Sequence, residues 1–471
     1  KMKMPKATAA TRATAAFAKY HQCGWRSSAT VSLSFSSFFG YGMAEQYRGG
    51  VDSDMLIADL DGDQQRAVTT DARLVAVIAG AGSGKTRVLT RRVAYRAAVG
   101  TADVAHTLVL TFTREAAGEL RRRLPKLGLT ERVAAGTFHS FAQQLLRQRW
   151  ADLDQPPRTV VNDRLRIMRE LLGRRDVESI VEEMNWATAR GLDGDAYESA
   201  RRSGRSAAVD AARVAEALAA YRAEQRRRGI VDLDDLLSLA NQALHDDPAF
   251  AEATRWRYRH VLVDEAQDLN PLQHRLVDEH RRGVDDLFLV GDPAQAIYGF
   301  NGADPTILQD VAAHFPRVEV IRLPTNHRCT PQIVTAGAHA LRTGGQTTDV
   351  RSGRPDGPEV DLVRHDDEHA EAASIGSRIA RLDPSLVRTG QVAVLARTHA
   401  ALTSVRTALA ERHVDVRRTV DGPGSPFATP ISAAARLADN VQLRRWAYDQ
   451  TEQSDDEIGA EVGTAVLDFL R

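Results

Sequence analysis

Short apolar runs alternate with longer helix-compatible stretches along much of the chain. The runs are rich in Val, Leu and Ile, which is typical of buried strands. They cover residues 74–78, 107–113, 133–137, 260–263, 286–292 and 318–322. Repeated strand and helix predict an α/β fold with a parallel sheet, right-handed crossovers, and ligands at the carboxyl ends of the strands.

The strand pattern stops between about residues 151 and 229, where the sequence is helix-compatible and rich in arginine. We therefore expect a helical insertion here. Its arginines, which include the runs 201–202 and 226–228, form either a solvated face, the commoner case, or a DNA contact. A helix that opens at Asp232 then returns the chain to the core.

A glycine-rich loop joins the first strand to the helix that follows it. Its residues are Ala79, Gly80, Ala81, Gly82, Ser83, Gly84, Lys85 and Thr86. Unpaired N–H groups at a helix N-terminus favour an anion, and glycines let the backbone approach phosphate oxygens closely. Lys85 would reach the β- and γ-phosphates of a nucleotide, and the Thr86 hydroxyl would hold Mg²⁺. A flexible turn without a ligand is the alternative.

The use of lysine favours the phosphate site. Past Lys19 only Lys85 and Lys126 remain, although the chain has 62 Lys and Arg residues. Nearly all the basic residues of this chain are thus arginines, yet the loop has a lysine, whose compact ammonium suits a phosphate.

The strand at residues 260–263 runs directly into two carboxylates, Asp264 and Glu265. Beside a phosphate-binding loop, such a pair has a chemical interpretation. Asp264 would hold Mg²⁺ through its water shell, and Glu265 would orient and deprotonate the water that attacks the γ-phosphate.

Three more polar side chains are candidates for the same site. Gln64 lies just before the first strand, where its amide can pair with the adenine edge. Gln295, after the strand at 286–292, is a candidate sensor of the γ-phosphate or its attacking water. Arg328, after the strand at 318–322, is a candidate arginine finger, for which a surface ion pair is the alternative.

Composition limits the class of protein. The chain has 471 residues, a formal net charge of +0, 43% hydrophobic and 26% charged residues, as expected of a globular protein of about three domains. Any nucleic-acid site must therefore be a local groove. The two cysteines, Cys23 and Cys329, cannot form a disulfide framework, and no apolar run is long enough to span a membrane. A cytoplasmic location fits best.

These motifs stand in an order that resembles the UvrD/Rep/PcrA family of superfamily 1 DNA helicases. The resemblance runs from about residue 60 to residue 328 and weakly on to about residue 418. It rests on Gln64, the loop at 79–86, and the segments 111–117, 136–140, 264–268, 291–300 and 326–328.

The resemblance implies two RecA-like lobes, with ATP and Mg²⁺ between them and an inserted subdomain in each. It implies that Gln64 reads adenine and that Arg87 lies near the base. It also implies that Lys85 and Thr86 serve the phosphates and Mg²⁺, and that Glu265 is the general base. In the family, closure of the lobes on ATP powers translocation from 3′ to 5′.

The resemblance also implies that single-stranded DNA crosses both lobes. Phe112 and Phe300 resemble the family's aromatic side chains that stack on bases, and packing in the core is the alternative for either. The other DNA-binding candidates lie in the family's motifs and are Thr113, Thr137, His139 and Tyr298.

Two departures from the family pattern stand out. His327 occupies the position where the family usually has a tyrosine that stacks on adenine. The family also needs a His-x-x-Lys-Gly motif late in the second lobe, and no lysine follows Lys126. Before that point, residues 391–398 predict a strand of the second lobe, and residues 401–412 predict the helix behind it.

The expected domain organisation follows from these matches. Residues 1–43 form a disordered or spurious tail, and 44–321 form the first RecA-like, ATP-binding lobe with the insertion at about 151–229. A partial second RecA-like lobe covers 322–420, and residues 421–471 begin a second insertion that is cut short.

The function expected is that of an ATP-dependent 3′–5′ DNA helicase, incomplete as given. Its partners would be single-stranded or partial-duplex DNA and repair or replication proteins. The first alternative is a non-catalytic, ATP-dependent DNA-binding or regulatory protein that needs a partner for the missing half. A small-molecule kinase is a weaker alternative, because Gln64, Gln295 and the Phe112/Phe300 pair have no natural role in one.

Overall fold

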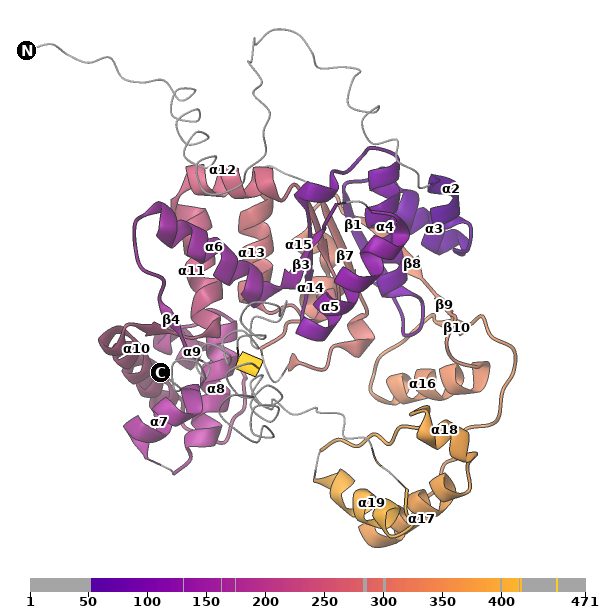
Figure 1. Cartoon of the computed structure of the whole chain (residues 1–471). Coiled ribbons are helices and arrows are strands. Elements are labelled where there is room, and N and C mark those ends of the chain that lie inside the picture. The colour runs from indigo at the N-terminus through magenta and orange to yellow at the C-terminus, as the bar shows by residue number, and fades with distance from the viewer. Residues whose placement is uncertain are drawn as a thin grey trace, which may run out of the picture. The chain divides into compact units, whose positions relative to one another are not determined.

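The computed structural model describes residues 52–129, 131–161, 163–173, 175–282, 286–299, 302–398, 400–414, 416 and 446–447. The chain divides into two compact units, Lys1–Val360 and Asp361–Arg471. Figure 1 labels many of their helices and strands.

A six-stranded parallel sheet forms the centre of the first unit (Figure 1). Its strands stand in the order β3-β2-β6-β7-β1-β8, and all five pairings are parallel. They are β1 (Leu74–Ala79), β2 (Thr107–Thr111), β3 (Ala134–Thr137), β6 (His260–Val263), β7 (Leu287–Gly291) and β8 (Glu319–Leu323). The predicted α/β fold is confirmed, and it is consistent with a RecA-like helicase lobe.

Helices cover both faces of this sheet, because alternate residues of each strand point to opposite faces. Val75 and Val77 pack into the core on one face, and Leu74 and Ala76 pack into the core on the other. The helices of the first face are α3 (Gly62–Thr69), α4 (Lys85–Ala98) and α5 (Arg114–Arg123). Those of the second are α6 (Phe138–Asp152), α11 (Leu233–Asp246), α12 (Pro248–Arg257), α13 (Pro271–Arg281), α14 (Thr306–Gln309) and α15 (Val311–His314).

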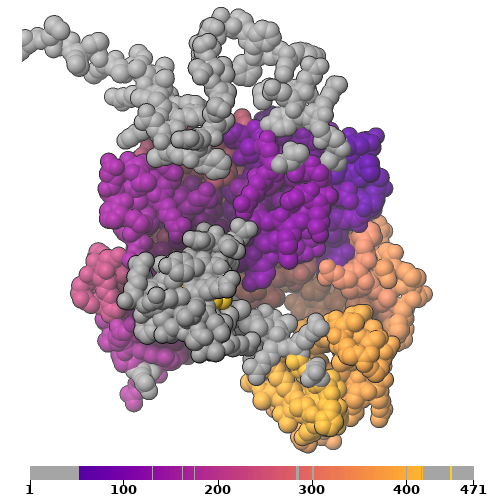
Figure 2. Space-filling model, viewed as in Figure 1, coloured from indigo at the N-terminus to yellow at the C-terminus, as the bar shows by residue number. Residues whose placement is uncertain are grey.

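Several short elements connect these layers. They are the helix α2 (Ser53–Ile57) and the 3-10 helices η1 (Val104–His106), η2 (Leu124–Leu127), η3 (Ala266–Asp268) and η4 (Pro293–Gln295). Figure 2 shows the surface in the same view, with the purple segment that includes α5 facing the viewer. Within the described ranges, no helix combines the length and the apolar character that crossing a lipid bilayer requires.

Four helices lie between α6 and α11 and have a core of their own. A two-stranded parallel ribbon of β4 (Thr159–Val160) and β5 (Ile230–Val231) brings the chain in and out. The helices are α7 (Arg164–Leu172), α8 (Val177–Ala189), α9 (Gly194–Arg202) and α10 (Ala211–Arg228). Many of their arginines are paired with carboxylates, as in the contacts of Arg227 and Arg228 with Glu224.

After β8 the chain stays in the first unit through Val360. It forms β9 (Thr325–Asn326), α16 (Pro331–Thr343) and β10 (Arg351–Ser352), and β10 pairs with β9 in parallel. The division between the compact units thus follows Val360, whereas the lobe boundary expected from the sequence is at residue 321. That boundary stays a prediction.

The second unit holds α17 (Glu368–Ala380), α18 (Pro384–Arg388) and α19 (Ala401–Ala410). Ala372 and Ile379 of α17 pack against Val405 and Leu409 of α19 in a small core. The helix expected at residues 401–412 is therefore confirmed.

The strand expected at residues 391–398 is wrong, because this segment is irregular in the structure. Val392 and Val394 pack against the small core between α17 and α19, which explains the apolar run. A strand also needs a neighbour to pair its backbone groups, and the described residues of this unit include no other strand. The segment 421–471 lies outside the described residues apart from 446–447.

Candidate nucleotide and nucleic-acid site

The glycine-rich loop runs from β1 into α4, at the carboxyl edge of the sheet. Gly82 and Gly84 have φ angles of 70° and 89°, in the left-handed region that favours glycine. A Cβ on Gly82 would lie 2.6 Å from Oδ1 of Asn326, and one on Gly84 would lie 2.9 Å from Nε2 of Gln64. No side chain of the described residues caps the N-terminus of α4. The loop therefore has the form and the available donors of a phosphate cradle.

Lys85 is the first residue of α4 and points toward the end of β6. Its Nζ lies 3.0 Å from Oε2 of Glu265, and its side chain is 11% exposed. The ammonium makes no aligned hydrogen bond within the described part of the chain, although it is buried. A buried ammonium carries three donors, so this one fits phosphate oxygens.

Glu265 lies between β6 and η3 in a strained conformation. Its φ of 52° and ψ of 43° are left-handed, which is rare for a residue with a Cβ and common at functional sites. Its backbone N–H donates to Oδ1 of Asp264 at 3.0 Å. Burial, together with the nearby Glu265 carboxylate, raises the pKa of Asp264 to about 6. A bound divalent cation would favour the charged carboxylate, so Asp264 fits the role of a metal ligand.

A buried amide links this carboxylate to the next strand. Gln267, which is 2% exposed, donates from Nε2 to Oε2 of Glu265 at 3.0 Å. Its Oε1 accepts the backbone N–H of Asp292 at 2.9 Å, and Oδ2 of Asp292 accepts Nε2 of Gln295 at 2.6 Å. The sequence motif contains Gln267, but sequence reasoning gave it no role, because only the fold brings it between β6 and β7.

Gln64 supports the loop directly. It is 1% exposed, its Nε2 donates to the carbonyl of Ser83 at 2.8 Å, and its Oε1 accepts the N–H of Asp61 at 3.3 Å. Its role in reading adenine stays a prediction, and it requires the amide to exchange one of these partners.

The segment after β8 packs against the loop. The backbone N–H of His327 donates to the carbonyl of Gly82 at 2.9 Å, and its Nε2 lies 2.7 Å from Oδ2 of Asp61. Arg328 is exposed, and its guanidinium pairs with no described residue, as an arginine finger requires. Arg87 pairs with Asp59, and its predicted position near the base stays a prediction.

A cavity of about 410 Å³ lies beside the nucleotide residues, between the sheet edge and the helices α7 and α8. Four of the predicted DNA-binding residues line it, namely Phe112, Thr113, His139 and Tyr298. The rings of Phe112 and Phe138 lie 5.6 Å apart in it. Thr137 does not line the cavity but caps α6 through its hydroxyl, and Phe300 lies outside the described residues.

The far wall of this cavity comes from helices α7 and α8 of the four-helix segment and from the start of α11. Arg164 donates to Asp232 and Asp234, which raise its pKa further above the usual range despite burial. The same side chain donates to Asn185 at 2.7 Å. Burial lowers the pKa of His139, although Asp234 favours its charged form. Sequence reasoning missed this wall, because its members lie far apart along the chain.

Comparison with known proteins agrees with this geometry. Residues 60–316 match the family model of the UvrD/REP helicase N-terminal domain. The ATP-dependent DNA helicase UvrD2 of Mycobacterium tuberculosis (strain ATCC 25618 / H37Rv) is 36% identical over 372 residues, which cover 74% of this chain and 53% of the relative. DNA helicase II of Escherichia coli (strain K12) is 29% identical over 383 residues, covering 78% of this chain and 52% of the relative.

The chain thus spans about half the length of the curated relatives it matches. The family model covers more than half of the chain, and it spans the loop, both carboxylates and the aromatic cavity. The chain belongs to the UvrD/REP helicase family.

Proposed function

We propose that this chain carries the ATP- and DNA-binding part of a DNA helicase motor, an ATP hydrolase that moves from 3′ to 5′ along single-stranded DNA. One observation carries the proposal. Lys85 and Glu265 face each other across 3.0 Å in the same compact unit as a cavity lined by aromatic rings. Relatives of similar sequence are named ATP-dependent DNA helicases.

The chain's own residues divide the hydrolysis between them. ATP and Mg²⁺, when bound, supply the reacting phosphoryl group and neutralise part of its charge. Lys85 and the backbone N–H groups of the loop orient the phosphates, while Thr86 and Asp264 hold the metal. Glu265 accepts a proton from the attacking water, and Arg328 stabilises the charge that develops on the transferring group.

The remaining nucleotide residues serve recognition. Gln64, Arg87 and His327 are assigned to the adenine end. An imidazole can stack on a base but is smaller than the tyrosine usual in the family. Gln295, whose Nε2 donates to Oδ2 of Asp292, is assigned to sensing the γ-phosphate or its attacking water.

The cavity is assigned to single-stranded DNA. Phe112 and Tyr298 present rings on which bases stack, at about 1–3 kcal/mol per base and with little regard to sequence. Thr113, Thr137, His139 and Phe300 complete the predicted path. Partial-duplex DNA and repair or replication proteins are the partners we expect.

A second candidate function is ATP-dependent DNA binding without turnover. It is favoured by the ion pair between Lys85 and Glu265, which engages the proposed general base. In this case a partner would supply the second half of the motor. We also propose the domain boundaries that the sequence analysis expects.

ATP hydrolysis with and without single-stranded DNA separates the two functions. A working motor shows DNA-stimulated turnover that Lys85→Ala and Glu265→Gln abolish. Lys126→Ala is the matched control, since Lys126 is exposed and belongs to η2 rather than to the loop. ATP binding without turnover, lost in Lys85→Ala, would instead support the second candidate. A wild-type chain that binds no ATP would contradict both.

A further inference from the structure

Two buried polar atoms at the DNA cavity have no partner among the described residues. They are Oγ1 of Thr111 and Oδ1 of Asp268, and both residues line the cavity. Thr111 ends β2, and Asp268 ends η3 just after the neighbouring strand β6. A buried unpaired acceptor costs about 1–3 kcal/mol, so a native fold retains one where a ligand supplies the missing bond.

Asp268 belongs to the cavity and to the nucleotide site at once. The residue is 8% exposed, and its backbone N–H donates to the carbonyl of Glu265 at 3.0 Å. Nε2 of Gln267 lies 3.0 Å from Oε2 of Glu265 and 3.4 Å from Oδ2 of Asp268. The amide of Gln267 therefore joins the two carboxylates. A ligand that binds Oδ1 of Asp268 would thus affect the hydrogen bond between Gln267 and Glu265.

The orientation of this amide is fixed by its other end. Oε1 of Gln267 accepts the backbone N–H of Asp292 at 2.9 Å, and that group can only donate. Nε2 must then face the two carboxylates. Burial, together with the charge of Glu265, raises the pKa of Asp268 to about 6. Burial of the ionised Asp268 carboxylate therefore costs free energy, and a ligand that donates a hydrogen bond to Oδ1 would reduce this cost.

The chemistry of a DNA strand limits what can reach this oxygen. Internal phosphates and deoxyribose carry acceptors only, so the N–H groups of a strand belong to its bases. Asp232 and Asp234 also line the cavity, and the one arginine there, Arg164, is already paired with both. The cavity therefore disfavours phosphate and favours a base.

We propose that Asp268 couples the two sites: its Oδ1 accepts an N–H group of a base held in the cavity, while its Oδ2 shares Gln267 with Glu265. Occupation of the cavity then changes the hydrogen bonding of the general base. This inference rests on the proposed function and adds a base preference to it. The exocyclic amine of cytosine satisfies the carboxylate, whereas the N3–H of thymine is flanked by two carbonyls that repel it.

Binding of dC-only and dT-only oligonucleotides of equal length tests the preference by fluorescence anisotropy. The wild-type chain should bind dC about 3-fold or more tightly than dT, since one good base contact is worth at least that. Asp268→Asn keeps the size but can donate or accept, so the ratio should fall to near 1. Asp246→Asn removes the same charge from an exposed residue outside the cavity and should keep the wild-type ratio.

The coupling is tested by titrating AMP-PNP and Mg²⁺ with and without saturating dC oligonucleotide. The oligonucleotide should change the AMP-PNP affinity of the wild type by about 5-fold or more, as is typical of coupled sites. Asp268→Asn should lose this change, whereas the exposed control Asp246→Asn should keep both the change and the affinity measured without DNA. An unchanged dC/dT ratio or unchanged coupling in Asp268→Asn overturns the inference, as does a wild type that binds both ligands without coupling. A wild type that binds neither ligand refutes the proposed function itself.

Discussion

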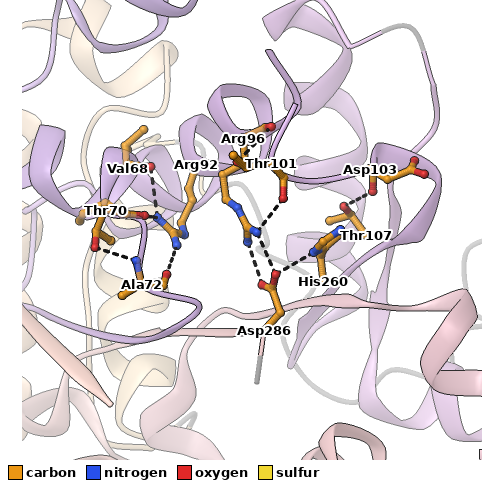
Figure 3. A network of polar contacts seen from close by, with 11 residues as sticks. Val68, Thr70, Ala72, Arg92, Arg96, Thr101, Asp103, Thr107, His260 and Asp286 are labelled. Atoms are coloured by element: carbon orange, nitrogen blue, oxygen red, sulfur yellow. Dashed lines mark hydrogen bonds and ion pairs between the residues drawn. The ribbon is translucent and has the colours of Figure 1, made fainter. Parts of the chain in front are cut away.

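The two ends of the central sheet bury carboxylates in opposite ways. At the amino end, Arg96 donates two hydrogen bonds of 2.8 Å to Asp286, and Nδ1 of His260 lies 2.9 Å from the same carboxylate (Figure 3). Beside it, the buried Arg92 donates to the backbone carbonyls of Ala67, Val68, Thr70 and Ala72. The contacts of Arg96 and His260 overcome the cost of burial and lower the pKa of Asp286 to about 2.

At the carboxyl end, the same kind of side chain lacks such partners. Burial and the neighbouring Glu265 raise the pKa values of Asp264 and Asp268 to about 6, and Lys85 has no aligned hydrogen bond among the described residues. Glu265 adds a strained backbone. The amino end therefore stabilises the fold, while the carboxyl end holds polar groups whose bonding is left to ligands.

The largest expected effect of this contrast is on Asp286. Asp286→Ala should lower the free energy of unfolding by about 3 kcal/mol, because it leaves Arg96 buried without its partner. Urea denaturation at neutral pH measures the change. Asp278→Ala is the control, since this more exposed carboxylate pairs with Arg281 at the surface and should lose less than about 1 kcal/mol. Equal losses in the two variants would contradict the assignment.

The pH dependence of the same residue has a definite sign. The folded pKa of Asp286, about 2, lies below its ordinary value of 3.8. The stabilisation by the carboxylate is therefore fully present above about pH 4 and is lost as the pH falls toward 2. The difference in unfolding free energy between the wild type and Asp286→Asn should shrink over this window. A difference that grows toward low pH would reverse the sign and refute the linkage.

A smaller effect of opposite direction is expected at the carboxyl end. Asp268→Asn should raise the free energy of unfolding by about 1 kcal/mol near pH 7.5, because it removes a buried charge that lacks a full set of partners. Differential scanning fluorimetry without ligands detects this as a higher Tm. A clear loss of stability would place Asp268 among the structural contacts.

The sheet was predictable from the sequence for a physical reason. Its four inner strands, β2, β6, β7 and β1, are buried on both faces, so they read as continuous apolar runs. The loop follows β1 directly, and the carboxylates follow β6. The cavity wall was not predictable, because Arg164 meets Asp232 only after a separation of 68 residues. Gln267 received no role from the sequence, because its hydrogen bonds link residues that follow two different strands, β6 and β7. The strand prediction for residues 391–398 was wrong, since a short apolar segment that covers a small helical core has the same sequence pattern as a buried strand.

Nucleotide binding at the loop tests the central claim most directly. Calorimetric titration of the ligand-free chain with AMP-PNP and Mg²⁺ should give binding that Lys85→Ala abolishes. Lys126→Ala should retain it, because the exposed Lys126 belongs to η2 and not to the loop. Binding that persists unchanged in Lys85→Ala, or no binding to the wild type, would contradict the assignment of the carboxyl end of the sheet as the ATP site.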